Sequence, residues 1–581
     1  MNTSNLNNRN EQITVEPLTT EAATFSPRIR FYFLTVILIA IYVAIGATVF
    51  GSTIYIDPSY TGSTQTGSMS NPYNSWKKFT INSGNAYLQK AGTTYTSTST
   101  ITINGKTGVT LGMYGTGNKP KIVTSGTGQH ILNVTSSSGV TVRDLEIYST
   151  GTWISAVIIQ GSNAGNNTID NCVLRHTEWG VRVLTTSGGN KIMHTTVNDT
   201  RDDGIYIKDA SSIEIGFCTI FDVNKKYLVN TDESYSSGDG VQIASTNNMV
   251  FNIHDNIIDH SSMGNKFCII AWGNNYSGTI ERNTLIGART KNNSGIYFSP
   301  TTKTVCVRYN IIKTGEYGIY NYAKLDAYYN VFSANNTAIQ TMSGYTVNAR
   351  NNVFYNNYNY GVSSASSTTT TLKNNIFNLG STSQKAIKTS SSVSSNNNVF
   401  NTQHSGFINS YSTLTAWRSA SGNDGSSVVG NPAFVNPSNQ DFHLQSGSAA
   451  INKGANVSLT KDYYGALVPV AGYPDAGVSE FNSNKMDEIT QGDSLGSEAA
   501  KEMLVFPNPS IDGKFSIKLG KLYEQTNVEV YDMLGRLVKK TTATMTAEPI
   551  LDMSTMPNGG YLIRVDTGSE KKTLKAIKNT L

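Results

Sequence analysis

The sequence has few charged residues, few prolines and few cysteines. Asp, Glu, Lys and Arg make up 15% of its 581 residues, against roughly 25% in an average soluble domain, and the net charge is +5. Binding to nucleic acid depends on a strong basic surface, so this balance argues against a nucleic-acid partner. The four cysteines (Cys172, Cys218, Cys268, Cys306) lack metal-ligand spacing and are interpreted as lone buried thiols.

Serine, threonine, asparagine, glycine and tyrosine take the place of the missing charge. There are 51 glycines and 31 tyrosines but only 14 prolines. Residues that favour strands therefore alternate with residues that favour tight turns. This composition predicts an all-β protein with many short strands.

One long apolar run stands near the N-terminus. Residues 1–30 form a polar leader, and residues 31–50 carry no charge and follow Arg28 and Arg30. Twenty apolar residues are enough to span a bilayer, but a basic flank, an apolar run and then small residues also describe a secretory signal. Residues 31–52 are therefore either a signal peptide or a membrane anchor, and we favour a cleaved signal.

A repeat runs through the middle of the chain. Asparagine followed by two apolar or small residues recurs, and from Asn256 onward the steps are 20 to 27 residues long. Thr195 and Cys218 fill the same slot earlier in the chain, and Asp144 extends the series backwards. The asparagines of this series are Asn171, Asn256, Asn283, Asn310, Asn330, Asn352, Asn375 and Asn398.

A second series runs in phase with the first. In each repeat a small residue, or Ile269 in one of them, precedes an apolar–any–apolar triplet. Two short strands in each repeat of this length are typical of a parallel β-helix, in which stacked asparagines can form a hydrogen-bonded ladder. We predict a right-handed parallel β-helix over residues 53–481. The second series is Ala156, Gly180, Gly204, Gly240, Ile269, Gly295, Gly318, Ala338, Gly361 and Ala386.

The two ends of this region resemble a known superfamily. The opening segments, residues 54–59, 67–73 and 112–120, resemble the first coils of pectate-lyase-like β-helices. The segments at residues 431–437, 441–444 and 447–454 resemble the closing part of many of the same proteins. The resemblance implies the β-helix fold and specifies the reaction poorly.

The C-terminal part has a different pattern. Residues 482–502 are polar and read as a linker, and residues 503–581 contain short alternating strands that predict a small immunoglobulin-like β-sandwich. This stretch, with Val505-Phe-Pro-Asn-Pro-Ser and Met556-Pro-Asn-Gly-Gly-Tyr, resembles the type A sorting domain of the type IX secretion system. The resemblance implies the type IX secretion machinery as a partner and a secreted or outer-membrane surface location.

The step from Cys218 to Asn256 is the longest between neighbouring members of the first series, because a polar loop is inserted around residues 222–238. Long loops in regular solenoids often carry function. Alignment of the coils on the second series places Trp179, Asp203, Asp239 and Cys268 at one position, preceded by Glu178, Asp202, Gly238 and Phe267.

Asp203 and Asp239 should therefore lie one above the other, about 4.8 Å apart. Like charges at that distance repel unless a cation or a proton lies between them. Neighbouring carboxylates suit Ca²⁺, which takes six to eight oxygen ligands. We predict Ca²⁺ as the cofactor, although Asp-Gly is also ordinary turn chemistry. The predicted ligands are Asp202, Asp203, Asp239 and Glu178, with Asp232 and Glu233 and also Asp222 from the inserted loop.

Strand alternation predicts which side chains point outward. Val181, Ile205, Val241 and Ile270 are expected to face the core. Arginine binds a uronate carboxylate with two hydrogen bonds, and aromatic rings hold sugar rings. The predicted substrate-binding residues are Arg182, Tyr206 and Gln242, and Lys208 points outward beside them.

These residues point to cleavage of a 4-linked acidic polysaccharide, such as pectate or alginate, by Ca²⁺-assisted β-elimination. The layout resembles that of family nine polysaccharide lyases, which implies Asp202, Asp203 and Asp239 as calcium ligands and Lys266 as the base. Lys208 is the other predicted catalytic residue. His260, Lys225 and Lys226 remain rivals as the base.

Three other functions stay open. A β-helix hydrolase of the polygalacturonase type would need motifs in an order that this sequence does not follow. A uronan epimerase would share the fold and the proton abstraction. A non-catalytic carbohydrate-binding or adhesin-like surface protein would share the groove without needing a base. We expect a monomer with an acidic polysaccharide as partner.

Overall fold

The computed structural model describes residues 51–482, except 126–129, 152–154, 225–237, 263–265, 290–292 and 471. It also describes residues 504–578, except 507–509, 511–512, 520–522, 533–535, 547–548 and 569–570. The predicted leader and the apolar run at residues 31–50 lie outside these ranges. Within them, no helix is both long and apolar enough to cross a membrane. The chain divides into two compact units, which meet between residues 487 and 488 of the sequence.

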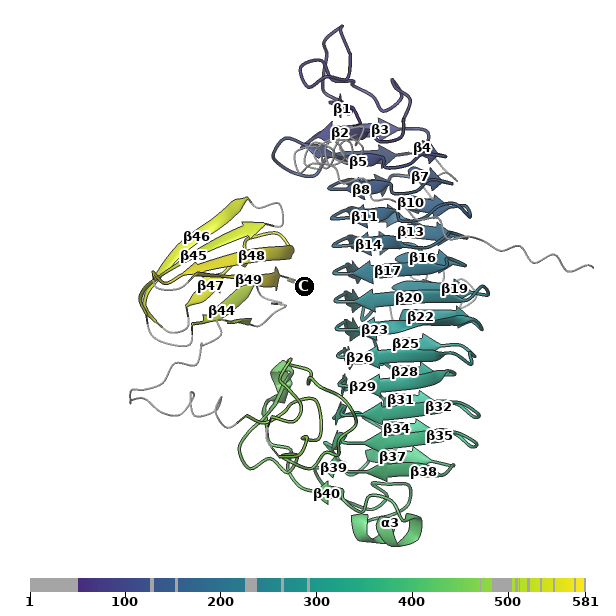
Figure 1. Ribbon diagram of the computed structural model, residues 1–581, viewed down its shortest axis with the longest axis vertical. Helices are drawn as coiled ribbons and strands as arrows, with labels where there is room; N and C mark the ends of the chain where they lie inside the picture. Colours follow the sequence, from purple (N-terminus) through teal and green to yellow (C-terminus); the bar gives the residue numbers. More distant parts are fainter. Residues whose placement is uncertain are drawn as a thin grey trace, which may run out of the picture. The chain divides into compact units, whose positions relative to one another are not determined.

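The first unit is a parallel β-solenoid of about 13 turns (Figure 1). Sheet A has 14 strands, from β1 (Thr53–Ile56) and β2 (Ala86–Lys90) to β38 (Val393–Asn396). Sheet B also has 14, from β3 (Thr94–Ser97) to β39 (Val399–Phe400) and β40 (Val428–Val429). Each complete coil adds one strand to each of three sheets, which confirms the predicted parallel solenoid.

Sheet C has 12 strands and carries the predicted substrate-binding residues. In chain order they are β4 (Ile101–Asn104), β7 (Leu132–Thr135), β10 (Ser155–Gln160), β13 (Trp179–Leu184), β16 (Ile205–Lys208), β19 (Val241–Ser245), β22 (Phe267–Gly273), β25 (Ser294–Phe298), β28 (Tyr317–Asn321), β31 (Thr337–Thr341), β34 (Tyr360–Ser364) and β37 (Lys385–Thr389).

Inward side chains of sheet C fill the solenoid core. Val181, Ile205 and Val241 are fully buried and lie in register, as predicted. In the next coil Val241 pairs with Ile269, so Cys268 takes the slot of the small residue. The alignment that gave this slot to Ile269 was wrong by one residue. Ile270 pairs with Gln242 on the outward row, so its predicted inward position was also wrong.

A ladder of asparagines joins the coils between sheets A and B. Asn283 Oδ1 accepts hydrogen bonds from the backbone N–H of Asn256 (3.0 Å) and from its Nδ2 (2.9 Å), and its own Nδ2 donates to the carbonyl oxygen of Ile253 (2.9 Å). Each asparagine thus satisfies backbone groups that would otherwise be buried without partners. The same pattern confirms the predicted ladder from Asn256 to Asn398 through Asn310, Asn330, Asn352 and Asn375.

The ladder begins differently from the prediction. Asn256 Oδ1 accepts the N–H of Cys218 (2.8 Å), and Thr195 Oγ1 accepts the N–H of Cys172 (3.3 Å), so Cys172 occupies the ladder slot. Asn171 lies one residue earlier, in the left-handed backbone region (φ 49°), and donates to Asp144 (φ 59°) at 2.7 Å. Asparagine and aspartate tolerate this conformation better than most residues. Asn171 is therefore explained by its backbone conformation and was wrongly predicted to belong to the ladder.

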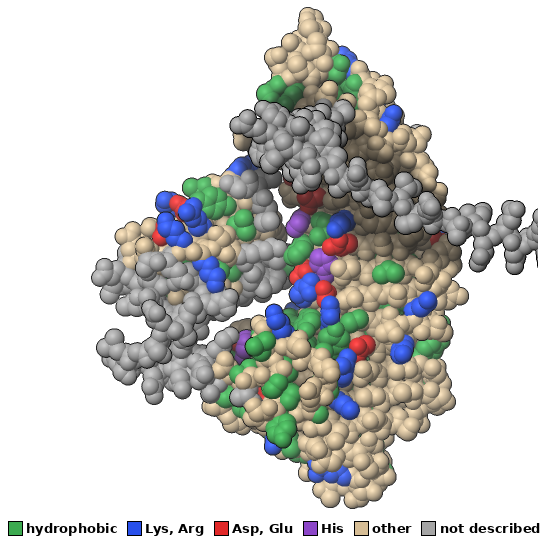
Figure 2. All heavy atoms as spheres, in the orientation of Figure 1, with side chains coloured by type: hydrophobic (Ala, Val, Ile, Leu, Met, Phe, Trp, Pro, Cys, Tyr) green, Lys and Arg blue, Asp and Glu red, His purple; other side chains and the backbone are tan. Residues whose placement is uncertain are grey.

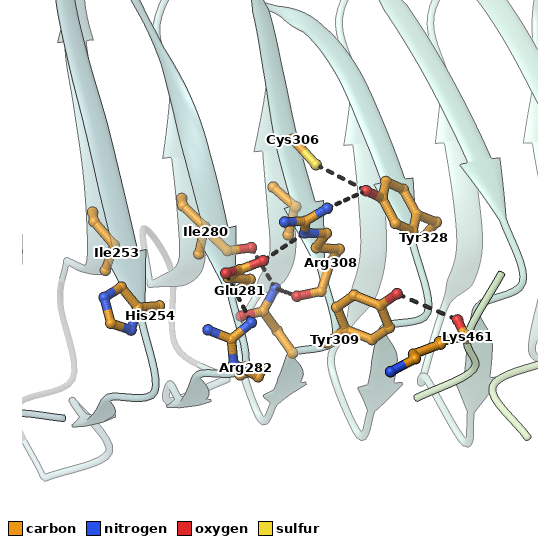
Figure 3. Close-up of polar contacts among 12 residues, drawn as sticks. Ile253, His254, Ile280, Glu281, Arg282, Cys306, Arg308, Tyr309, Tyr328 and Lys461 are labelled. Carbon is orange, nitrogen blue, oxygen red and sulfur yellow. Dashed lines mark hydrogen bonds and ion pairs between the residues drawn. The ribbon is translucent and has the colours of Figure 1, made fainter. Parts of the chain in front are cut away.

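Charged side chains gather at the corner between sheets A and B, which we call the A–B corner. Figure 2 shows acidic, basic and histidine side chains next to one another on this side of the solenoid. In Figure 3, Glu281 lies between Arg282 and Arg308, and the Nη1 of Arg282 is 2.8 Å from Glu281 Oε1. Arg282 also binds Asp255 (2.9 Å), which accepts from His254 Nδ1 (2.8 Å). These pairs link neighbouring coils.

The segment that follows the last coil covers the C-terminal end of the solenoid. Helix α3 (Leu414–Ser421) begins after Thr413, whose side chain accepts the N–H of Ala416, and it buries Trp417. Trp417 Nε1 donates to the buried Asp424 (2.8 Å). Part of the segment that follows, residues 431–481, packs Phe442 and its neighbours against the outer side of the last strands of sheet B.

The second unit contains two small antiparallel sheets, which confirms a small β domain. Its core includes Phe515, Val528 and Ile563. One sheet is β43 (Leu504–Phe506), β44 (Lys514–Lys518) and β47 (Ile550–Asp552). The other is β46 (Leu537–Thr546), β45 (Tyr523–Asp532), β48 (Gly559–Asp566) and β49 (Lys571–Lys578).

Candidate functional site

The candidate site lies on the outer face of sheet C, where β13, β16 and β19 run side by side. Arg182 pairs in register with Tyr206, and Tyr206 pairs with Gln242. All three side chains are partly exposed, whereas their strand neighbours are buried in the core. The predicted outward row is therefore present.

Asp203 and Asp239 lie in successive coils at one edge of this row. Asp203 Oδ1 accepts the backbone N–H of Asp239 (2.8 Å), and Asp239 Oδ1 accepts that of Phe267 (2.9 Å). Their exposed fractions are only 2% and 3%. The predicted stacking is confirmed, and each carboxylate also ties its coil to the next.

Burial holds protons on this pair. It raises the pKa of Asp239 to about 8, although the hydrogen bond from Phe267 and the charge of Lys266 act in the opposite direction. Burial also raises the pKa of Asp203 well above its usual value, with further increases from Asp202 and Asp239. At neutral pH the favoured state therefore keeps a proton on Asp239.

Arg182 lies between two aromatic rings. Its guanidinium carbon is 4.4 Å from the centroid of the Trp179 ring and 5.8 Å from that of Tyr206. Burial lowers the pKa of Arg182, and the nearby Tyr206 and acidic residues oppose this. Among the described residues, no carboxylate lies within ion-pair distance of Arg182. A half-buried guanidinium without a paired carboxylate is an attractive partner for an anion.

Two of the other predicted ligands, Glu178 and Asp202, lie near the same arginine. Glu178 (1% exposed) and Asp202 (7%) both act on the pKa of Arg182. With its side-chain amide oriented so that the nitrogen faces Asp203, Gln242 donates to Oδ1 (3.3 Å) and Oδ2 (3.2 Å) of that carboxyl group.

The predicted bases are placed differently from one another. Lys266 directly precedes β22 and is close enough to Asp239 to affect its pKa. Lys208 is exposed and lies in register with Leu184 and Ala244, and no contact joins it to the aspartate pair within the described residues. Lys225 and Lys226 lie outside those residues, as do the predicted ligands Asp232 and Glu233.

His260 is fully buried and supports the structure. Its Nε2 lies 3.1 Å from the carbonyl oxygen of Gly238, and burial lowers its pKa. This geometry suits a neutral imidazole that donates to the backbone, so His260 is poorly placed as the base.

The described residues do not by themselves fit calcium. They contain no group of three or more His, Cys, Asp or Glu side chains placed to hold a metal ion. Asp203 and Asp239 each already accept a backbone N–H, and their raised pKa values favour protons over charge. Calcium stays a prediction that depends on Asp232 and Glu233.

Sequence reasoning missed the aromatic residues of this face. Tyr297 and Tyr320 stand two residues after Gly295 and Gly318, the same offset that places Arg182 after Gly180. The register confirms that they continue the outward row. Extending the coil alignment past Gly240 would have found them.

Residues 504–579 match the family model of the secretion system C-terminal sorting domain. This match indicates type IX secretion, so the protein is secreted or attached to the cell surface. It also implies interaction with the secretion machinery, which confirms the interpretation of the C-terminal strands.

No curated protein matches the chain. Among solved structures, lacto-N-biosidase of Eubacterium ramulus is 12% identical, with a TM-score of 0.32 over 60% of this chain and 64% of that one. An α-1,3-glucanase of Streptomyces thermodiastaticus is 13% identical (TM-score 0.33, 53% and 60%). A rhamnogalacturonan lyase is 13% identical (TM-score 0.28, 60% and 87%). The chain spans less than two thirds of the first two proteins, and likenesses this distant assign no activity.

Proposed function

We propose that this protein is a secreted enzyme that cleaves an acidic polysaccharide by β-elimination on the outer face of sheet C. The observation that carries this proposal is Arg182, half-buried between Trp179 and Tyr206 with no carboxylate at ion-pair distance among the described residues. Its planar guanidinium suits the two oxygens of a uronate carboxylate. The cation–π contact with Trp179 favours this position of the guanidinium before substrate binds.

Each step of the elimination has a candidate group. Arg182 binds the uronate carboxylate and so makes the proton on the adjacent carbon C5 more acidic. Lys266 is the base that takes that proton, and the electron pair of the C5–H bond forms the C4–C5 double bond as the C4–O bond breaks. The departing oxygen takes the proton of Asp239, whose pKa of about 8 keeps it protonated at neutral pH.

Hydrolysis is a second candidate, and the same protonated Asp239 favours it. Glycosidases use one protonated carboxyl group as general acid and a second carboxylate as base or nucleophile. Asp202 would be that second group. In this reaction water is added and no double bond forms.

One experiment separates these possibilities. The purified protein is incubated with pectate and alginate, with Ca²⁺ or with a chelator, while ultraviolet absorbance and new reducing ends are followed. A lyase increases both, and a hydrolase increases reducing ends alone. Binding without either signal would refute an enzymatic role on these uronans, and loss of the signal with chelator would support the calcium prediction.

Substitution of the arginine tests the site. Arg182→Lys keeps the charge but loses the two-pronged geometry, so we expect KM to rise about tenfold. Arg175→Lys is the matched control, because Arg175 also lies over a tyrosine ring (Tyr148, 4.4 Å) but is paired with Glu146 (2.6 Å). Equal effects of the two substitutions would refute the role of Arg182.

A further inference from the structure

Aromatic side chains extend the candidate site along sheet C. Beyond Gln242 the outward row continues through Ile270, Tyr297 and Tyr320, which pair in register across β22, β25 and β28. Trp272 stands beside this row, in register with Ala244. From Gln242 to Tyr320 the row crosses three strand spacings, or about 14 Å.

These rings support one another. The Trp272 and Tyr297 centroids are 6.2 Å apart with planes at 22°, and those of Tyr297 and Tyr320 are 5.6 Å apart at 21°. Phe267 and Tyr322 contact Tyr297 at 5.0 and 6.1 Å. We call this set, completed by Tyr317 at 4.7 Å from Tyr320, the aromatic face.

The aromatic face is not required to fill the core. The core beneath it is formed by Ala271, Ile296 and Ile319, which are fully buried. Trp272, by contrast, is 54% exposed. A large exposed aromatic that joins a row of partly exposed tyrosines is typical of a binding surface.

We propose that the aromatic face binds the sugar residues that adjoin the reacting uronate in the same chain. This inference rests on the proposed function and names its substrate class: a polysaccharide or long oligosaccharide, bound along the solenoid axis. The members of the aromatic face carry no charge, so they recognise the apolar faces of sugar rings and do not need a carboxylate there. The uronate requirement is confined to the position at Arg182.

Trp272→Ala in the full-length protein tests this. We expect KM for the polysaccharide to rise about tenfold, the effect of losing about 1.4 kcal/mol of contact, while the rate on the shortest oligosaccharide that is cleaved stays unchanged. Trp272→Phe should retain most of the affinity because it keeps a ring. The control is Val250→Ala, which removes an apolar side chain that is 49% exposed on sheet A.

Binding measured without turnover separates the two proposals. In the Asp239→Asn background, the polysaccharide should protect tryptophan fluorescence from a soluble quencher, and Trp272→Phe should remove the share of that protection that comes from Trp272 while the share from Trp179 remains. Protection without any cleavage by the wild type would leave the aromatic face standing and refute the enzymatic proposal. Cleavage with equal KM in the wild type and Trp272→Ala would refute the aromatic face alone.

Discussion

Two acidic regions of the solenoid differ in how their charges are matched. At the A–B corner, Glu281 lies between Arg282 and Arg308, and Arg282 also binds Asp255. On sheet C, Asp203 and Asp239 are buried, and no cation lies at ion-pair distance from them within the described residues.

The pairing at the corner spans neighbouring coils and matches each of these carboxylates with an arginine. On sheet C the acids take up protons and Arg182 stays without a carboxylate partner in the described part of the chain, so both proton transfer and anion binding remain possible. Sites with strongly shifted pKa values are often functional. The corner pairs therefore join coils, and the sheet C cluster is the candidate for the proposed reaction.

The largest expected effect is on the rate. In the proposed reaction, Asp239→Asn removes the proton that the leaving oxygen takes, while Asn Oδ1 can still accept the N–H of Phe267. We expect kcat to fall by roughly 10²–10⁴. Asp255→Asn at the corner is the matched control and should leave kcat unchanged in the same steady-state assay. A rate within twofold of wild type for Asp239→Asn would remove Asp239 from the mechanism.

A second expectation concerns pH. Because the folded-state pKa of Asp239 is raised to about 8, the folded protein holds a proton that the unfolded chain loses above its ordinary pKa near 3.8. Stability should therefore fall as the pH rises from about 4 to about 8, by up to roughly 1.4 kcal/mol per pH unit. Denaturant unfolding of wild type and Asp239→Asn should diverge across this window, in favour of the variant. Parallel curves would contradict the raised pKa.

The smallest effect is expected at the corner. Glu281→Ala leaves Arg282 and Arg308 without their shared carboxylate, but both guanidiniums can be rehydrated because 46% and 36% of their side chains are exposed. We expect a loss of about 1 kcal/mol in the free energy of unfolding and no change in kcat. A drop in kcat at unchanged stability would show that the corner takes part in the reaction.

Much of the solenoid could be predicted from the repeat, because side chains alternate between the core and the outer face along each strand. A shift of one residue would place the apolar side chains of a strand on the outer face, so the apolar pattern fixes the register. The prediction failed where that constraint is weak. Residues 267–271 are Phe-Cys-Ile-Ile-Ala, which are apolar in either register, so Ile269 and Ile270 were each assigned to a position one residue too early in the coil.

The candidate site was only partly predictable. Two Asp-Gly pairs at the same offset were enough to predict that Asp203 and Asp239 stack. Their protonation depends on how deeply the fold buries them, and a repeat pattern carries no measure of depth. The position of Arg182 between the Trp179 and Tyr206 rings depends on side-chain packing, which the pattern does not specify either.

The asparagine ladder also has an evolutionary consequence. Between Asn330 and Asn398 it advances in steps of 22 or 23 residues, and each step also adds one phenylalanine to a buried stack of Phe332, Phe354, Phe377 and Phe400. If one such segment were duplicated or deleted, the coils on either side would still present an asparagine and a phenylalanine to each other. Each hydrogen bond of the ladder would then be replaced by an equivalent one. Genes for such proteins can thus change the length of the sheet C face by about 4.8 Å at a time without redesigning the core.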